Sequence, residues 1–402
     1  MISVTKLLCG VATSGDALRY GSAAPAGAHR RAPLHRQQAV GRAQDRRPIV
    51  VWNMSRACNL QCVHCYAEAA RGATGDELTT EQARAMIGDL AGFGAPVLLF
   101  SGGEPTLRPD LLELGRYARE KGLRTVISTN GTLITAELAR RIKEADFGYV
   151  GVSLDGVGEV NDRFRGHPGA FKAALAGIRN CVAVGQNVGL RFTITRRNAD
   201  QVPAIFDLVE SEQINRLCFY HLVYSGRGSD LIGEDLPRPE ARALVDLIFE
   251  RTLDLFRRGL TKDVLTVDNH CDGVYLYLRL QRDDPARAED VLQLLRWNGG
   301  NASGIAIADV DWSGNVHADQ FWQQHTFGNV KQRPFSQLWT DMAQPLLAGL
   351  KDRKALLKGR CGACRHLDIC NGNFRARAEA VHGDPWAPDP ACYLSDEEIG
   401  IA

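Results

Sequence analysis

Strand-like and helical stretches alternate six times between residues 49 and 223, and this alternation constrains the fold more than any other feature. The strand-like stretches cover residues 49–54, 97–100, 124–128, 149–154, 189–195 and 216–223. Amphipathic stretches separate them, and the first is announced by Thr79 and Gln82 at the spacing of a helix capping box. Since strand–helix–strand units join parallel strands by right-handed crossovers, the pattern predicts an α/β fold with a parallel sheet.

Two of these stretches distinguish a barrel from a flat sheet. Their apolar and polar side chains alternate: Val150, Val152 and Leu154 with Gly151, Ser153 and Asp155, and Leu190, Phe192 and Ile194 with Arg191, Thr193 and Thr195. A parallel sheet covered on both faces would instead show unbroken apolar runs. We therefore predict a partial, TIM-like (β/α)6 barrel whose polar inner face surrounds a ligand cavity.

Composition and charge limit the class of protein to which this chain can belong. Its 402 residues are 45% hydrophobic with a net charge of +1, which excludes a wholly disordered chain and an overall basic, nucleic-acid-binding surface. No run is long and apolar enough for a membrane span or a secretory signal, so we expect a cytoplasmic protein.

Four regions are predicted: a flexible arm at 1–47 with a basic excess, the barrel at 48–234, a helical linker at 235–297, and a small domain at 298–402 containing a hairpin around residues 311–315.

Seven of the eleven cysteines form two groups with ligand-like spacing. The first is Cys58-x3-Cys62-x2-Cys65, in the loop after the first strand, and the second is Cys361-x2-Cys364-x5-Cys370-x21-Cys392. Clustered thiols in a long chain without an export signal indicate metal binding or catalysis rather than disulfides. Three thiolates leave one iron of a [4Fe–4S] cluster open. The alternative for this group is a zinc site completed by His64 or a distant ligand.

The first group resembles the signature of the radical S-adenosylmethionine (SAM) superfamily. His64 takes the place of the aromatic-like residue before the third cysteine, and Gly102-Gly103-Glu104-Pro105 follows the second strand as in that family. The resemblance implies that Cys58, Cys62 and Cys65 hold a catalytic [4Fe–4S] cluster and that the Gly102–Glu104 backbone binds the methionyl amino group of SAM. Reductive cleavage of SAM then gives a 5′-deoxyadenosyl radical.

Further SAM contacts are predicted from polar residues at later strand ends. Similar proteins use such residues for the ribose and carboxylate of SAM; here they are Ser128, Asn130, Ser153, Asp155 and Thr193. Ordinary strand-end caps and turns are the alternative reading for each of them.

The second group resembles the C-terminal SPASM and twitch domains of radical SAM enzymes, and this implies an auxiliary [4Fe–4S] cluster on Cys361, Cys364, Cys370 and Cys392. Zinc is the alternative. Two-cluster relatives have further cysteines where this chain has Asp319, five residues after Gly314, and Phe374. We therefore predict one auxiliary cluster.

Residues 46–398 resemble the NirJ-type subfamily of haem d1 biosynthesis, most specifically across 373–379 and 383–393. The resemblance implies 12,18-didecarboxysirohaem as substrate, removal or conversion of its propionate chains, and a flavodoxin or ferredoxin as electron donor. Arg191, Arg196, Arg197 and Arg227 are candidate carboxylate-binding cations, while Tyr220, His221 and His270 are candidates for proton transfer or haem contact. The alternatives are a related haem-pathway enzyme that removes acetate or decarboxylates propionate, a peptide-modifying maturase, and a non-catalytic iron–sulfur electron carrier.

Overall fold

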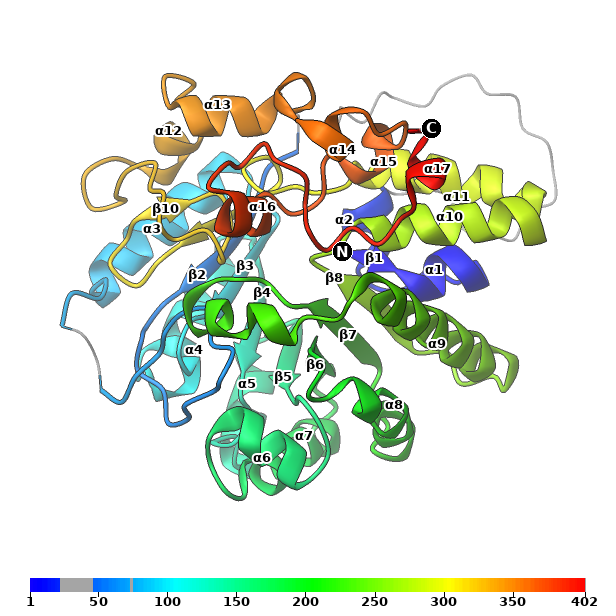
Figure 1. Ribbon diagram of the computed structural model, residues 1–402. Coiled ribbons are helices and arrows are strands. Elements are labelled where there is room, and N and C mark those ends of the chain that lie inside the picture. Colours follow the sequence, from blue (N-terminus) through cyan, green and yellow to red (C-terminus); the bar gives the residue numbers. More distant parts are fainter. Residues whose placement is uncertain (22–45, 73–74, 402) are drawn as a thin grey trace, which may run out of the picture.

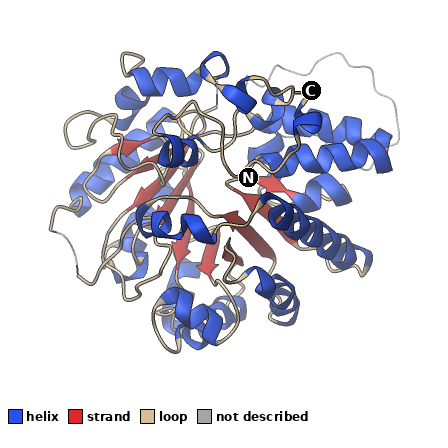
Figure 2. Ribbon diagram, in the orientation of Figure 1, coloured by secondary structure: helices blue, strands red, loops and turns tan. Residues whose placement is uncertain are grey.

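A curved sheet of mainly parallel strands, covered on its outer side by helices, forms the centre of the protein (Figure 1, Figure 2). The computed structural model describes residues 1–21, 46–72 and 75–401. Seven neighbouring parallel strands run from β2 to β8, and β9 lies parallel on the other side of β2. The predicted partial barrel is confirmed.

The sheet order is β1-β8-β7-β6-β5-β4-β3-β2-β9-β10. The strands are β1 (Ile2–Ser3), β2 (Ile49–Asn53), β3 (Val97–Ser101), β4 (Arg124–Thr129), β5 (Tyr149–Ser153), β6 (Val188–Ile194), β7 (Arg216–His221), β8 (Asp263–Val267), β9 (Ile307–Val310) and β10 (Val316–His317). The short strands β1 and β10 pair antiparallel with β8 and β9.

Helices follow most of the strands and form the outer layer of the barrel. Those of the barrel are α3 (Thr80–Phe93), α4 (Leu111–Glu120), α5 (Ala136–Glu144), α6 (Glu159–Arg165), α7 (Ala170–Ala183), α8 (Val202–Ser211) and α9 (Arg238–Arg257). The predicted capping box of α3 is present, since Thr79 and Gln82 bond each other's backbone N–H. The main core lies between the strands and these helices, and contains the fully buried Trp52, Phe100 and Phe192.

The start of the chain differs from the predicted flexible arm. Residues 2–20 form β1, α1 (Val4–Cys9) and α2 (Asp16–Tyr20). Ile2, Val4 and Leu7 are buried, and the backbone N–H of Ser3 donates to the Tyr20 hydroxyl. A few apolar residues suffice here because β8 offers an unpaired edge to β1. The rest of the predicted arm, residues 22–45, lies outside the described residues.

The predicted helical linker also contributes to the sheet. It contains β8 between α9 and two long helices, α10 (Cys271–Asp283) and α11 (Pro285–Asn298). The five residues of β8 are all buried, but the run is too short and too polar at its start to stand out in the sequence.

The C-terminal region packs against the barrel as an extension of its sheet. The predicted hairpin is formed by β9 and β10, and β9 pairs with β2. Beyond it lie α12 (Phe335–Trp339), α13 (Pro345–Lys351), α14 (Gly359–Gly362), α15 (Leu367–Cys370), α16 (Arg375–His382) and α17 (Asp396–Ile399). In Figure 1, α12 and α13 lie above α3 on the left, while α15 and α17 lie beside α10 and α11 on the right.

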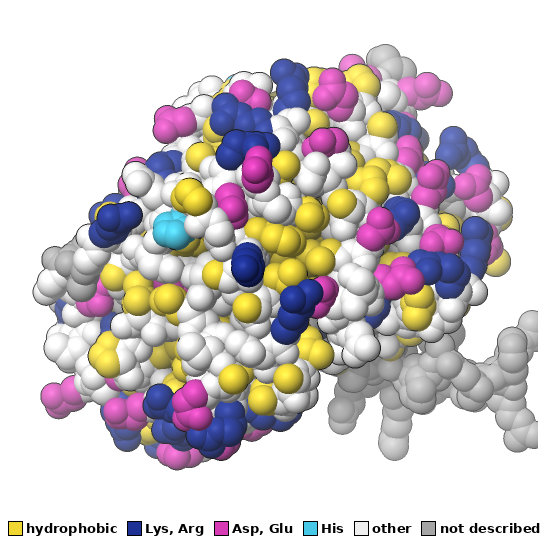
Figure 3. Space-filling model, turned by 90° about the horizontal axis from the view of Figure 1, so that it is seen from below, with side chains coloured by type: hydrophobic (Ala, Val, Ile, Leu, Met, Phe, Trp, Pro, Cys, Tyr) yellow, Lys and Arg dark blue, Asp and Glu magenta, His cyan; other side chains and the backbone are white. Residues whose placement is uncertain are grey.

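Charges of both signs are interspersed on the face shown in Figure 3, with a group of hydrophobic side chains near its centre. No helix of the described residues is long and apolar enough to cross a membrane.

Candidate active site

The first cysteine group lies in the loop that leaves β2. The loop is held to α6 by two backbone hydrogen bonds, from Gln61 to Arg165 and from Val63 to Phe164. Each cysteine sulfur accepts a hydrogen bond from nitrogen: Cys58 from Leu60 N–H at 3.4 Å, Cys65 from Ala69 N–H at 3.4 Å, and Cys62 from the Arg165 guanidinium at 3.5 Å. Such donors stabilise thiolates, so the loop fits an iron–sulfur cluster.

Burial has the opposite effect on the free thiols. It raises the pKa of Cys58 to about 12, and it raises the pKa of Cys62 above its ordinary value although Arg165 partly offsets the shift. Without a bound cation these two groups would stay protonated at neutral pH. Binding of iron is therefore coupled to the loss of protons from these thiols.

The glycine turn after β3 packs directly against the cysteine loop. Gly103 N–H donates to Ser55 O at 2.7 Å, and Glu104 N–H donates to Ala57 O at 2.8 Å. Gly102 has φ +115°, and a Cβ on Gly103 would lie 2.2 Å from Ala57 O. Both positions thus require glycine for the close approach of the two backbones.

The side chains of Glu104 and Asp155, two of the predicted SAM-binding positions, form hydrogen bonds within the fold. Glu104 is fully buried: one oxygen accepts from Thr106 and Thr129, and the other accepts from Asn130 N–H at 2.8 Å. Asp155 is also fully buried and accepts from Thr193 N–H at 2.8 Å. Neither side chain lines the cavity. Their hydrogen bonds to neighbouring strand ends hold the wall of the cavity in place.

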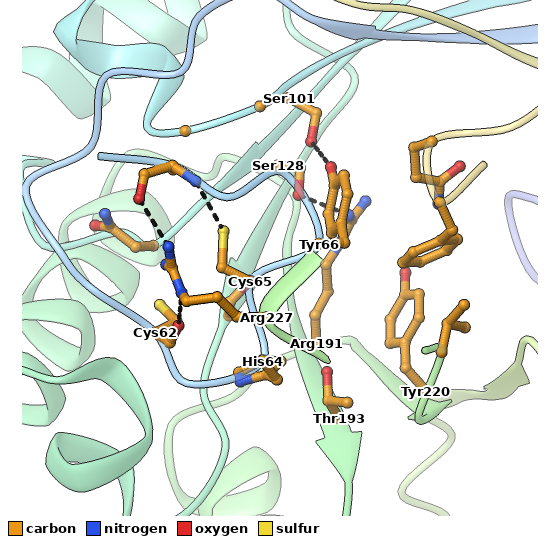
Figure 4. Close-up of a pocket in the computed structure, with 18 of the residues that line it drawn as sticks. Cys62, His64, Cys65, Tyr66, Ser101, Ser128, Arg191, Thr193, Tyr220 and Arg227 are labelled. Carbon is orange, nitrogen blue, oxygen red and sulfur yellow. Dashed lines mark hydrogen bonds between the residues drawn. The ribbon is translucent and has the colours of Figure 1, made fainter. Parts of the chain in front are cut away.

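The other predicted SAM contacts line one cavity together with the cysteines (Figure 4). This set contains Cys58, Cys62, His64, Cys65, Gly102, Gly103, Ser128, Asn130, Ser153 and Thr193. They come from the ends of β2 to β6, as the alternating inner face predicted. Their roles as cofactor contacts remain predictions.

Arg165 is a site residue whose contacts with the cysteine loop could not be predicted from the sequence. It forms an ion pair with Asp155 at 2.5 Å, and the same carboxylate contacts His64 Nε2 at 3.2 Å. Burial lowers the pKa of His64 despite Asp155, so this imidazole is neutral. The signal for Arg165 was the helical spacing of Asn161, Phe164 and Arg165, all of which face inward from α6.

The opposite end of the cavity is formed by β7, β8 and the segment after β10. Tyr220, His221, Asp268 and Phe321 line this end. His221 Nε2 lies 2.9 Å from Asp272, whose other oxygen accepts from the Tyr393 hydroxyl at 2.7 Å. Burial alone would lower the pKa of His221, but Asp272 raises it above its ordinary value.

The four candidate cations separate into two pairs. Arg191 and Arg227 line the cavity, whereas Arg196 and Arg197 are exposed, and Arg197 pairs with Glu234 at 2.9 Å. The last two follow the end of β6 and do not line the cavity. His270 is buried but does not line the cavity.

The second cysteine group surrounds a smaller cavity in the C-terminal region. Cys361, Cys364, Cys370 and Cys392 all line it. The Arg375 guanidinium donates to Cys361 at 3.8 Å, and His366 N–H donates to Cys364 at 3.4 Å. Four sulfurs around one cavity with N–H donors fit a [4Fe–4S] cluster. Among the described residues, no three His, Cys, Asp or Glu side chains converge on a point that could hold a single metal ion.

Cys271 lies next to this second group, which its position in the sequence did not reveal. It is fully buried at the start of α10, and its thiol donates to Asn269 Oδ1 at 2.9 Å. The nearby Cys271 thiol holds the pKa of Cys392 below its ordinary value. Asp319, which stands where two-cluster relatives have a cysteine, is buried and accepts from Phe321 N–H at 2.9 Å.

Comparison with known proteins decides the family. Residues 52–209 match the model of the radical SAM superfamily. The chain is 58% identical over 403 aligned residues to Fe-coproporphyrin III synthase of Methanosarcina barkeri, covering 100% of this chain and 99% of that protein. The chain belongs to the radical SAM superfamily. It is also 45% identical to pre-heme d1 synthase of Dinoroseobacter shibae, with 89% of this chain and 88% of that protein covered.

Among solved structures, this radical SAM protein is similar in fold to Streptococcus suis SuiB bound to its precursor peptide SuiA. The TM-score is 0.69 at 18% identity, covering 87% of this chain and 76% of that chain. The protein is thus a radical SAM enzyme whose cofactors are SAM and a [4Fe–4S] cluster. When bound, these groups supply the 5′-deoxyadenosyl radical, and the protein provides their geometry.

Proposed function

We propose that this enzyme forms Fe-coproporphyrin III from 12,18-didecarboxysirohaem by radical removal of acetate side chains. The observation that carries the proposal is the 58% identity, along the whole chain, to a protein named Fe-coproporphyrin III synthase. Acetate-removing enzymes of the haem pathway are among the alternatives that the sequence predicts to the haem d1 reaction.

The site residues support a flat, carboxylated substrate. Tyr66, Tyr220 and Phe321 give the cavity aromatic walls, and Arg191 and Arg227 supply cationic groups. In this proposal Cys58, Cys62 and Cys65 hold the catalytic cluster, while Gly102, Gly103 and the strand-end residues hold SAM. Cys361, Cys364, Cys370 and Cys392 hold one auxiliary [4Fe–4S] cluster. A flavodoxin or ferredoxin is the proposed electron donor, and the cytoplasm the proposed location.

The haem d1 reaction is the second candidate, favoured by the 45% identity to pre-heme d1 synthase over most of the chain. It starts from the same tetrapyrrole but changes propionates instead of acetates. The products therefore separate the two candidates directly.

The experiment uses anaerobically reconstituted enzyme, SAM, a reductant and 12,18-didecarboxysirohaem. We expect 5′-deoxyadenosine together with a tetrapyrrole that matches authentic Fe-coproporphyrin III in mass and chromatographic retention. Loss of propionate-derived mass with both acetates retained would favour the haem d1 reaction. Deoxyadenosine formation with no change in the tetrapyrrole, across several reductants, would refute both and favour a peptide substrate.

A further inference from the structure

Arg191 occupies an unusual position on the inner face of the barrel. It lies on β6 between Leu190 and Phe192, which are fully buried in the core on the opposite face of the strand. Its side chain crosses in front of β5, where a Cβ on Gly151 would lie 2.5 Å from Arg191 Nε. The absence of a side chain at Gly151 therefore makes room for this guanidinium.

The Arg191 guanidinium forms one hydrogen bond to the described residues. One terminal nitrogen donates to the Ser128 hydroxyl at 2.7 Å (Figure 4). Nε is buried without a hydrogen-bond partner, and no Asp or Glu of the described chain forms an ion pair with Arg191. A guanidinium has five N–H donors, so the single hydrogen bond to Ser128 leaves most of the donors of this cavity-lining arginine without a partner among the described residues.

Other arginines of this protein with little exposure have carboxylate or carbonyl partners. Arg165 has Asp155 at 2.5 Å, and Arg377 has Asp389 at 2.8 Å with both side chains fully buried. Arg227, which also lines the cavity, donates to the carbonyl oxygens of Cys62 and Ala69. Among the described residues, the Arg191 side chain donates to neither a carboxylate nor a carbonyl oxygen; its acceptor is the Ser128 hydroxyl.

Arg191 lies close to the end of the cavity that is opposite the cysteines. The guanidinium carbon lies 5.9 Å from the centre of the Tyr220 ring, and Tyr220 belongs to that opposite end with His221 and Phe321. A ligand stacked against these aromatic side chains would place its carboxylate within reach of Arg191.

We propose that Arg191 binds a side-chain carboxylate of the tetrapyrrole and thereby sets which edge of the ring system faces the radical. The inference rests on the proposed function and names the residue that binds a carboxylate of the substrate. The carboxylate of SAM is the competing partner, since Ser128 is itself a predicted SAM contact.

The test measures anaerobic binding of two probes by absorbance titration in the presence of SAM. The probes are Fe-coproporphyrin III and its tetramethyl ester, which keeps the ring but lacks the negative charges. We expect the wild-type enzyme to prefer the free acid. Arg191→Met should bind the acid about 10- to 100-fold more weakly, and the ester with unchanged affinity.

Two further variants keep the result interpretable. Arg191→Gln retains an N–H donor for Ser128 without the charge, and it should lose the same preference even if Arg191→Met does not fold. Arg197→Met removes an exposed arginine of the next loop, so it should keep the wild-type preference.

The outcomes distinguish binding of a tetrapyrrole carboxylate by Arg191 from binding of the SAM carboxylate, and both from failure of the proposed function. Equal acid-over-ester preference in wild type and both Arg191 variants would overturn the inference while leaving the proposed function intact. Weaker SAM binding with an unchanged tetrapyrrole preference would assign Arg191 to the SAM carboxylate, and would also overturn it. A wild-type enzyme that binds neither probe would refute the proposed function itself.

Discussion

Replacing Gly103 by alanine should disable the catalytic site without unfolding the protein. The new Cβ would lie 2.2 Å from Ala57 O and 2.7 Å from its carbonyl carbon. These are backbone atoms of the cysteine loop, so no side-chain rotation can relieve the contact. The loop has to move by about 0.8 Å before the shorter contact reaches 3.0 Å.

This movement strains the two hydrogen bonds that join the turn to the loop, from Gly103 to Ser55 and from Glu104 to Ala57. Their weakening costs about 1 kcal/mol each, which a protein of this size tolerates. Catalysis is more sensitive, because a shift of about 1 Å in reacting groups lowers rates by about 100-fold. We expect Gly103→Ala to form 5′-deoxyadenosine about 100-fold more slowly than the parent.

The assay follows deoxyadenosine by chromatography under anaerobic conditions, with iron content and thermal unfolding measured on the same samples. Gly92→Ala is the matched control, since a Cβ there meets nothing within 4 Å and the residue lies inside α3. The control should retain the parent rate. If Gly103→Ala also retains the parent rate with full iron content, the close approach of the two loops has no catalytic importance and the reasoning fails.

Two other perturbations test the C-terminal region. Burial alone would raise the pKa of Asp389, but the ion pair with Arg377 holds this pKa below its ordinary value. The pair therefore stabilises the fold at neutral pH. This contribution to the free energy of unfolding disappears as the pH falls into the acid range. Asp389→Asn should therefore lower the free energy of unfolding by about 3–5 kcal/mol near neutrality and flatten its decline toward low pH in denaturant titrations; a parallel pH profile would contradict this. Replacing Cys58, Cys62 and Cys65 together with alanine should reduce the iron content from about eight to about four per chain and leave a cubane signal that does not respond to SAM. A triple variant that keeps about eight irons, or holds only zinc, would refute the prediction of one auxiliary [4Fe–4S] cluster per chain.

The barrel was predictable because its strands and helices have strong local patterns. The alternation on β5 and β6 identified the inner face correctly, and residues such as Ser153 and Thr193 line the cavity as expected. The chain's first residues and β8 were missed because both are short. They acquire strand structure by pairing with each other and with β7, which no local pattern records.

The site was predictable at the level of cysteines and strand ends, but not at the level of side-chain roles. Glu104 and Asp155 stand at the expected strand ends, but the buried donors that their carboxylates accept from were not predictable from residue type and spacing. Arg165 and Cys271 approach cysteines that are far away in the sequence. Such contacts depend on how α6 and α10 pack, so residue type and spacing alone did not reveal them.

The central claim, that the radical formed at this site acts on a tetrapyrrole, is tested most directly by isotope transfer. The enzyme is incubated anaerobically with SAM, a reductant and 12,18-didecarboxysirohaem carrying deuterium in its side chains, and the mass of the 5′-deoxyadenosine is measured. The account predicts deuterium in deoxyadenosine, in step with conversion of the tetrapyrrole. Deoxyadenosine that forms without deuterium, while the tetrapyrrole stays unchanged, would contradict it.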